Sequence, residues 1–301
     1  MQIGNLNIRI GADPEVFVTD KQGKFVCAHN MVQGTKENPF KVANGAVQVD
    51  GMALEFNIDP ADSAEEFQAN ISSVMKQLAA MVPEYNLNAV PVAEFGKEMM
   101  DAAPMEAKEM GCDPDLDAWN GGRENPKPNG EVDFRTAAGH IHIGWTEGMD
   151  INDPGHVEAC IMLVKQLDFY LGIPSIIIDG CTKRRELYGK AGAFRVKPYG
   201  VEYRVLSNFW LKSAELTDWA YRNTCKAIGE LLNGTFHNDL NTLRVINSGN
   251  VNHAKSVVDV YGLEMPKVVH KNVKPKIATG CDAYDNHAFN PFFGGNNVRR
   301  T

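Results

Sequence analysis

Four predicted strands carry acidic, imidazole or guanidinium groups on the face opposite their apolar residues. Side chains two residues apart leave the same side of an extended chain. The groups that project in this way are Asp13 with Glu15, Glu55, His140 with His142, and Glu202 with Arg204. Carboxylates and imidazoles ligate cations such as Mg2+ or Mn2+, and arginine binds phosphate through two parallel hydrogen bonds. Together the four strands predict a site that holds cations beside a phosphate.

Each of these groups taken alone has a more ordinary interpretation. A polar strand face is usually exposed to solvent, and charged residues are seldom buried. A pair of histidines on one strand is more often structural than metal-binding. Glu202 and Arg204 would most often form a salt bridge. The prediction therefore depends on all four strands meeting in one place.

A basic stretch lies between the histidine strand and the Glu202 strand. It contains Lys183, Arg184, Arg185, Lys190, Arg195 and Lys197. Lys190 and Arg195 flank small residues, which let an anion approach backbone and side chains closely. Lys183 is interpreted as solvent-exposed. The sequence lacks the glycine-rich loops of P-loop and dinucleotide-binding proteins, so those nucleotide-binding folds are excluded.

The elements that must position these groups follow from hydrophobic periodicity. Residues 8–58 predict two hairpins, one turning at 21–24 and the other at Asp50-Gly51. Further strands are expected at 139–145 and 201–207, and helices at 63–82, 155–171, 213–233 and onward to 262. Residues 96–130 are rich in Gly, Pro, Asn and Asp and predict a long loop.

The order of these elements predicts an α+β fold. Strands and helices alternate irregularly, and the strands are half-buried, which favours a curved, mostly antiparallel sheet backed by helices. Residues 1–235 are expected to form the catalytic core. Residues 236–301 are expected to form a helical C-terminal extension with an irregular polar tail, packed on the same domain.

Composition restricts the class of protein. The 301 residues are 44% hydrophobic and 23% charged, and the net charge of −8 argues against a nucleic-acid partner. Six scattered cysteines without a CxxC pair predict reduced thiols. Neither a signal peptide nor an apolar stretch near the ~20 residues that span a bilayer is apparent, so no membrane partner is expected. The prediction is a soluble protein of the cytoplasm.

At these strands the sequence resembles a known family. GADPEVFV is similar to the GxExEFF strand of glutamine synthetases, and VQVDGMALEF, AGHIHIG and GVEYRVL are similar to the acidic, GxHxH and ExR segments that follow it. QGTKENPF, GCDPDLDAW, TAAGHIHIG and YGKAGAFRVKPYGVEYRVLSNFW resemble the phage-type carboxylate–amine ligases, the amidoligase type 2 group. The resemblance spans about residues 8–215 and keeps the motifs in family order.

The resemblance implies a glutamine-synthetase-like fold and an ATP-dependent ligase that uses Mg2+ or Mn2+. The implied reaction joins a small-molecule or peptide carboxylate to an amine through an acyl phosphate. The implied metal ligands are Asp13, Glu15, Asp50, Glu55, His140 and Glu202. The implied nucleotide-binding residues are His140, Arg185 and Lys190, and the implied catalytic residues are Arg204, Arg195 and Lys190. Asp13 stands where glutamine synthetases have the longer glutamate.

Three other functions fit the same residues. A small-molecule kinase on the same fold would release ADP without forming an amide. A metal-dependent hydrolase would use the carboxylates and histidines without ATP. A metal-binding phage protein would have no catalytic activity.

Overall fold

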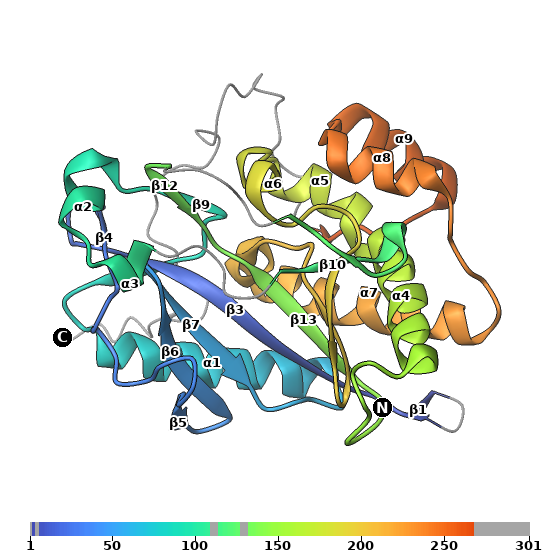
Figure 1. Ribbon diagram of the computed structural model, residues 1–301, viewed down its shortest axis with the longest axis horizontal. Helices are drawn as coiled ribbons and strands as arrows, with labels where there is room; N and C mark the ends of the chain where they lie inside the picture. Colours follow the sequence, from blue (N-terminus) through green and yellow to red (C-terminus); the bar gives the residue numbers. More distant parts are fainter. Residues whose placement is uncertain (1, 4–5, 109–113, 127–131, 268–301) are drawn as a thin grey trace, which may run out of the picture.

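A large antiparallel sheet runs through the computed structural model, which describes residues 2–3, 6–108, 114–126 and 132–267 (Figure 1). The strands of this sheet are β3 (Arg9–Thr19), β4 (Phe25–Val26), β5 (Phe40–Val42), β6 (Gly45–Asp50), β7 (Ala53–Ile58), β8 (Asn86–Asn88), β10 (Leu116–Asp117), β11 (Arg123–Glu124), β13 (Gly139–Gly144), β14 (Ala193–Lys197) and β15 (Gly200–Tyr203). Their order is β11-β10-β14-β15-β13-β3-β7-β6-β5, with β4 and β8 also paired to β3. Two small ladders join β1 (Gln2–Ile3) to β2 (Leu6–Asn7) and β9 (Val92–Glu94) to β12 (Phe134–Thr136).

Helices α1 (Ala64–Met81), α4 (Pro154–Leu167) and α7 (Ala214–Leu232) cover one face of this sheet. The other helices are α2 (Gly96–Ala102), α3 (Met105–Lys108), α5 (Ile173–Asp179), α6 (Lys183–Leu187), α8 (Leu240–Ser248) and α9 (Val251–Tyr261), with 3-10 turns η1 (Ala118–Asn120) and η3 (Asn208–Lys212) and a π-helical turn η2 (Asp168–Gly172). Helix α1 packs on β6 and β7, α4 packs on β14 and β15, and α7 contacts both helices (Figure 1). This arrangement confirms the predicted α+β class and the antiparallel sheet.

Strand alternation separates the two faces of the sheet. The helix-covered face carries buried apolar side chains, among them Ile10, Val16, Leu54, Phe56, Ile141, Ile143 and Val201. The intervening residues therefore project from the opposite face. Register then brings the predicted polar groups together, because His140 lies opposite Asp13 and Glu15 lies opposite Glu55. Glu202 lies between the strand neighbours His142 and Arg195.

Local signals in the sequence account for the first hairpins and the first helix. The predicted turns lie between β3 and β4 and between β6 and β7. The Ser63 hydroxyl accepts a hydrogen bond from the Glu66 backbone N–H at the start of α1. The Glu66 carboxylate accepts one from the Asp62 N–H. The predicted cap is therefore present, although the carboxylate reaches one residue further back than in a standard capping box.

The stretch predicted as a loop and one predicted strand differ from expectation. Within 96–130, the described residues form α2, α3, β10, η1 and β11, so the prediction of a structureless loop was wrong. Glycines and prolines conceal these short elements, and some contacts that hold them are distant in sequence, as where β10 pairs with β14. Strand β15 ends at Tyr203, short of the predicted 207. Helices α8 and α9 pack against α5, while the division at residue 235 stays a prediction.

One helix among the described residues has the length and the apolar composition of a membrane-spanning helix. Residues 154–179 form 26 continuous helical residues, and an 18-residue window within them has a mean hydropathy of 1.5, so the expectation that no apolar stretch approaches such a length was wrong. Within the protein, 72% of that window is buried, which assigns its apolar side chains to the core. The turn widens at η2, immediately before Pro174, which has no backbone N–H to continue the helical ladder.

The four described cysteines, Cys27, Cys160, Cys181 and Cys225, are free thiols as expected, and the other two lie outside the described residues.

Asp168 in the widened turn joins three segments behind the site. Its carboxylate accepts hydrogen bonds from Trp119 Nε1 at 2.6 Å, the Gly192 N–H at 2.7 Å and the Tyr203 hydroxyl at 2.8 Å. Burial raises the pKa of this carboxyl to about 7, against the effect of the three donors. Trp119 follows β10, Gly192 precedes β14, and Tyr203 lies in β15. A single carboxyl group thus fixes three of the segments that carry site residues.

Replacing Asp168 by alanine is expected to lower the free energy of unfolding by about 3 kcal/mol or more, because it leaves three donors without an acceptor. Asp168→Asn should cost much less, since its carbonyl oxygen can accept from Trp119 and Gly192 while the Tyr203 hydroxyl turns to accept from the amide. Urea unfolding of both variants measures the difference. Equal losses for alanine and asparagine would contradict this account.

Candidate active site

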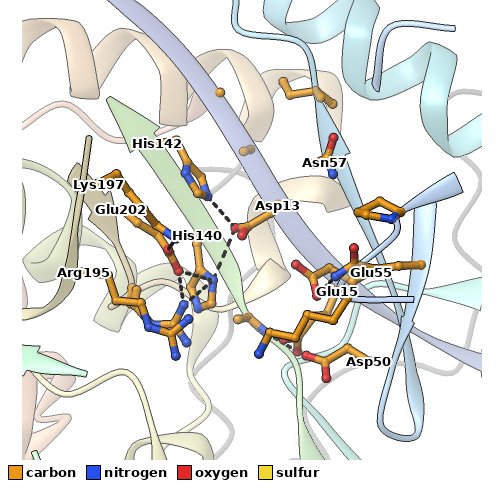
Figure 2. Close-up of a pocket in the computed structure, with 18 of the residues that line it drawn as sticks. Asp13, Glu15, Asp50, Glu55, Asn57, His140, His142, Arg195, Lys197 and Glu202 are labelled. Atoms are coloured by element: carbon orange, nitrogen blue, oxygen red, sulfur yellow. Dashed lines mark hydrogen bonds and ion pairs between the residues drawn. The ribbon is translucent and has the colours of Figure 1, made fainter. Parts of the chain in front are cut away.

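The polar face of the sheet forms the floor of a pocket of about 830 Å3. Its lining residues come from β3, β6, β7, β13, β14 and β15 and from the loops around them. Figure 2 shows two groups of side chains in it: Glu15, Glu55 and Asp50 lie on one side of Asp13, and the histidines and Glu202 lie on the other.

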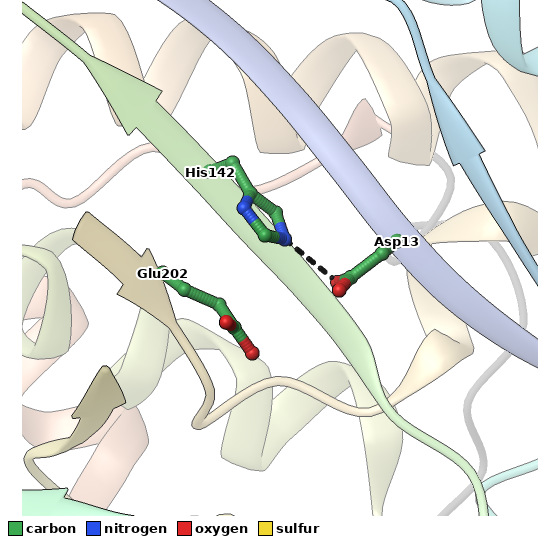
Figure 3. A group of neighbouring side chains, drawn as sticks. All are labelled: Asp13, His142 and Glu202. Carbon is green, nitrogen blue, oxygen red and sulfur yellow. Dashed lines mark ion pairs between the residues drawn. The ribbon is translucent and has the colours of Figure 1, made fainter. Parts of the chain in front are cut away.

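The first group surrounds Asp13. One ligand atom from each of Asp13, His142 and Glu202 lies within 4.8 Å of the others (Figure 3). His140 adds a further nitrogen, since its Nδ1 is 3.3 Å from Asp13 Oδ1 and 3.4 Å from Glu202 Oε1. Burial, helped by Arg204, lowers the pKa of His140, which favours the neutral imidazole that can ligate a metal. Burial opposes ionisation of Glu202, but Arg204 together with His142 and His140 outweighs it and holds that pKa well below its usual range.

His142 uses both ring nitrogens within the protein. Its Nε2 lies 2.9 Å from Asp13 Oδ1, and its Nδ1 lies 2.5 Å from the Tyr199 hydroxyl. Burial would lower the pKa of His142, but the Asp13 carboxylate outweighs it and raises the pKa. A hydroxyl that donates to Nδ1 leaves the proton on Nε2, where it is directed at Asp13. His142 therefore orients Asp13, and His140 is left to face the cation position.

Tyr199→Phe is expected to lower the affinity of the Asp13 group for Mn2+ by about tenfold, the lower end of the effect of removing an outer-shell partner. The His142 ring loses the contact that fixes its tautomer, so Asp13 is held less firmly. Electron paramagnetic resonance of free Mn2+, titrated without nucleotide, measures the affinity. Tyr85→Phe, at a partly exposed tyrosine outside the pocket, is the matched control. Unchanged Mn2+ affinity in Tyr199→Phe would contradict a positioning role.

The second group consists of Glu15, Asp50 and Glu55. Their ligand atoms also lie within 4.8 Å of one another. Burial, followed by repulsion from Asp50, raises the pKa of Glu15 to about 8. Burial and the charges of Asp13, Asp50 and Glu15 raise the pKa of Glu55 well above its usual value. Three oxygen ligands that repel one another in a buried setting are the donor set that a hard divalent cation satisfies.

Basic side chains complete the pocket on the β14–β15 side. Arg204 Nε donates to Asp115 Oδ1 at 2.5 Å, and Arg204 Nη1 contacts Glu202 and lies 3.3 Å from His140 Nδ1. Lys197 Nζ pairs with Glu202 Oε2 at 2.7 Å. Arg195 lines the pocket next to them. The carboxylate of Glu202, a candidate cation ligand, is therefore in contact with groups suited to a phosphate.

The structure brings most of the predicted residues into this pocket. Those that line it are Asp13, Glu15, Asp50, Glu55, His140, Arg195, Glu202 and Arg204. Lys190 and Arg185 are not among its lining residues: Lys190 is exposed, and Arg185 is buried, donating to the Cys181 carbonyl and the Ser175 hydroxyl. The catalytic and nucleotide-binding roles predicted for them have no support from this geometry.

Several lining residues had no predicted role. They are Asp115, Arg135, Arg184, Tyr188, Lys197 and Tyr199. The position of Lys197, two residues after Arg195 on one strand, was a signal that both share a face. The others lie in loops or short elements, where sequence spacing does not indicate which way a side chain points.

The segment that carries the histidine strand and the ExR strand matches a known protein family. Residues 129–236 match the model of the family described as "Phage phiEco32-like COOH.NH2 ligase-type 2". The match confirms the resemblance over these residues, which include His140, Arg195, Glu202 and Arg204.

Solved structures give distant similarities to this chain. A GmaS–ADP complex aligns over 87% of this chain and 72% of its own, with 10% identity and a TM-score of 0.38. GmaS without ligand aligns over 88% and 71%, with 10% identity and a TM-score of 0.36. A bifunctional glutathione synthetase from Pasteurella multocida aligns over 85% of this chain but 49% of its own, with 7% identity and a TM-score of 0.38. TM-scores below 0.5 do not establish a common fold, and no curated protein matches the sequence.

Proposed function

We propose that the protein is an ATP-dependent carboxylate–amine ligase whose active site is the pocket on the polar face of the sheet. The observation that carries this proposal is the meeting of two cation-ligand groups with Arg195 and Arg204 in one pocket. The family match over residues 129–236 supports the same class of reaction. We infer a cytoplasmic enzyme, because ATP is available there and free thiols persist.

The two ligand groups fit divalent cations. Glu15, Asp50 and Glu55 would hold one, and Asp13, Glu202 and His140 would hold another. When bound, Mg2+ supplies positive charge that neutralises phosphate oxygens. The raised pKa values of Glu15 and Glu55 support this assignment, since a cation would relieve the repulsion that raises them.

The proposed reaction has two steps. A carboxylate oxygen of the acid attacks the γ-phosphorus of ATP, the bond from that phosphorus to the β–γ bridging oxygen breaks, and ADP leaves. The amine then attacks the acyl carbon, the bond from that carbon to the phosphate oxygen breaks, and the nitrogen loses a proton. The products are an amide, ADP and phosphate. Activation is needed because direct attack on a carboxylate would have to expel oxide.

The chain's own groups position the reactants and neutralise charge. Arg204 is held by Asp115 and Glu202, so its guanidinium is fixed before substrate binds. Arg195 lies on the neighbouring strand opposite Glu202. Phosphoryl transfer depends mainly on such positioning and on charge stabilisation, with little covalent chemistry by the protein.

Hydroxylamine tests the proposal without knowledge of the natural amine. Hydroxylamine converts an acyl phosphate into a hydroxamate, which gives a coloured complex with ferric ion. Incubating the protein with ATP, Mg2+, hydroxylamine and a library of carboxylic acids should give hydroxamate and ADP in equal amounts. ADP released with a stable phosphorylated product and no hydroxamate would identify a kinase instead. Absence of both from every acid, together with absence of nucleotide binding, would reject the ligase.

A further inference from the structure

One end of the pocket, beyond Glu15, differs in character from the rest. It is lined by the basic and hydroxyl side chains of Arg135, Arg184 and Tyr188 and by the apolar residues Phe17, Met52 and Ala107. Neither arginine forms an ion pair with a described carboxylate. At the opposite end, by contrast, Arg9 pairs with Asp62 at 3.3 Å and donates to the Pro60 carbonyl.

Arg184 is buried at this end, with 2% of its surface exposed. Its Nη1 donates to the Val205 carbonyl at 2.9 Å, and its Nη2 lies 3.5 Å from the Arg204 carbonyl. Its Nε has no acceptor among the described residues. Gly189 makes this placement possible: its φ is +71°, and a Cβ there would lie 1.8 Å from Arg184 Nη1. The hydrogen-bond partners of this buried guanidinium are neutral carbonyls, and the carboxylates of Asp179 and Glu15 act on its charge without forming an ion pair with it.

Tyr188 lies one helical turn after Arg184, at the end of α6. Its backbone N–H donates to the Arg184 carbonyl, so the two side chains leave α6 in neighbouring positions. The Tyr188 hydroxyl is buried and has no hydrogen-bond partner among the described residues. Burial raises the pKa of this phenol to about 12, so it remains a hydrogen-bond donor at neutral pH. A buried hydroxyl without a partner costs about 1–3 kcal/mol, which a ligand would offset.

Arg135 approaches the same end from β12. Its Nη1 donates to the carbonyls of Val132 and Phe134, and its Nη2 donates to the Lys108 carbonyl at 2.9 Å. Its Nε has no acceptor among the described residues. The Lys108 carbonyl ends α3, and Ala107 of the same helix lines the pocket. Arg135 therefore fixes the apolar wall and adds a second guanidinium that forms no ion pair with a described carboxylate.

We propose that this end of the pocket selects an acid that carries a second anionic group, a carboxylate or a phosphate, beside its reacting carboxylate. The second group accepts from the Tyr188 hydroxyl between the two guanidiniums, and the carbon chain lies against Phe17 and Met52. The reacting carboxylate then points toward Glu15 and the cation position. This assignment rests on the proposed ligase function, since it concerns the acid substrate of that reaction.

Calorimetry with ADP and Mg2+ present tests the assignment through binding alone. Succinate, glutarate and adipate are compared with monocarboxylic acids of the same chain length, butyrate, valerate and hexanoate. At least one diacid should bind about tenfold more tightly than its matched monoacid, which corresponds to about 1.4 kcal/mol. 3-Phosphonopropionate distinguishes the two anions: tighter binding than succinate and glutarate would identify the second group as a phosphate.

Two variants should abolish the preference. Tyr188→Phe removes only a hydroxyl that has no partner among the described residues, so folding should be unaffected. Arg135→Gln removes one charge together with hydrogen bonds to the carbonyls of Val132, Phe134 and Lys108. Tyr188→Phe should reduce diacid affinity by about tenfold while leaving monoacid and nucleotide affinity unchanged. Arg135→Gln should reduce diacid affinity by about tenfold or more, with a lower melting temperature that reports the lost hydrogen bonds. Tyr85→Phe and Arg222→Gln, both outside the pocket, are the matched controls.

Three results would overturn the assignment. Two concern binding: a wild-type protein with no diacid or phosphonate preference, and a Tyr188→Phe variant that keeps the preference. Hydroxamate formation from monocarboxylic acids at the same efficiency as from diacids would reject the assignment while sustaining the ligase. Absence of nucleotide binding to the wild-type protein would reject the ligase itself.

Discussion

Replacing Arg204 by alanine is expected to lower turnover by about a hundredfold or more, the scale seen when one well-placed charge stabiliser is removed. The guanidinium contacts Glu202, Asp115 and His140, so it is fixed at the centre of the β15 side of the pocket. Its contribution is greatest when charge spreads over the transferring phosphoryl oxygens, so nucleotide affinity should fall much less than turnover. ADP release and calorimetry measure the two quantities.

The contacts of Arg204 also define the rival interpretation. Asp115 and Glu202 would each lose an ion-pair partner in Arg204→Ala, and a purely structural role would appear as a lower melting temperature. Arg204→Lys keeps the charge but cannot reproduce the two-pronged contact, so it should stay folded and recover only part of the turnover. Asp115→Asn loosens the guanidinium without removing it and should lower turnover less. A folded Arg204→Ala variant that releases ADP at the parent rate would remove Arg204 from the mechanism.

Much of the site was predictable because strand alternation is a local property. Asp13 and Glu15 share a face whatever the partner strands are, and so do His140 and His142. The apolar residues between them, such as Ile141, decide which face is covered by helices. Register on neighbouring strands then places these groups side by side. Hairpin and capping signals are local in the same way, which is why the β6–β7 turn and α1 lie where expected.

The residues that escaped prediction depend on contacts distant in sequence. Asp115 reaches Arg204 across 89 positions, and Asp168 reaches Trp119 across 49. Arg184 and Lys190 belong to the same basic stretch, yet one is buried at the pocket and the other is exposed. Both are basic residues of one stretch, so residue type does not indicate which of them reaches the pocket. Only the path of the chain between α6 and β14 distinguishes them. Of the residues given roles in this stretch, Arg195 lines the pocket while Lys190 and Arg185 do not, and the roles themselves stay predictions.

Without divalent cation, the protein is expected to lose stability as the pH rises from about 5 to 8. The pKa of Glu15 is raised from 4.5 to about 8, and that of Glu55 is raised as well. A carboxyl group whose pKa is higher in the folded protein than in the unfolded chain contributes stability at a pH below its pKa in the unfolded chain. This stability is lost as the pH rises through the pKa of the group in the folded protein. The loss in chelator should be on the order of a few kcal/mol, seen as a melting temperature several degrees lower.

Added Mg2+ should reverse this loss, and more strongly at pH 8 than at pH 5.5. The cation binds the ionised carboxylates, so its stabilisation of the folded state grows as protons leave them. Glu15→Gln tests the origin of the effect: the amide oxygen can still accept from the Ala138 N–H, but one cation ligand and one charge are gone. The variant should show a flatter pH dependence in chelator and a smaller response to Mg2+. Glu65→Gln, at an exposed carboxylate on α1, should behave as the parent protein. An equal Mg2+ response at both pH values would show that Glu15, Asp50 and Glu55 do not form a cation site.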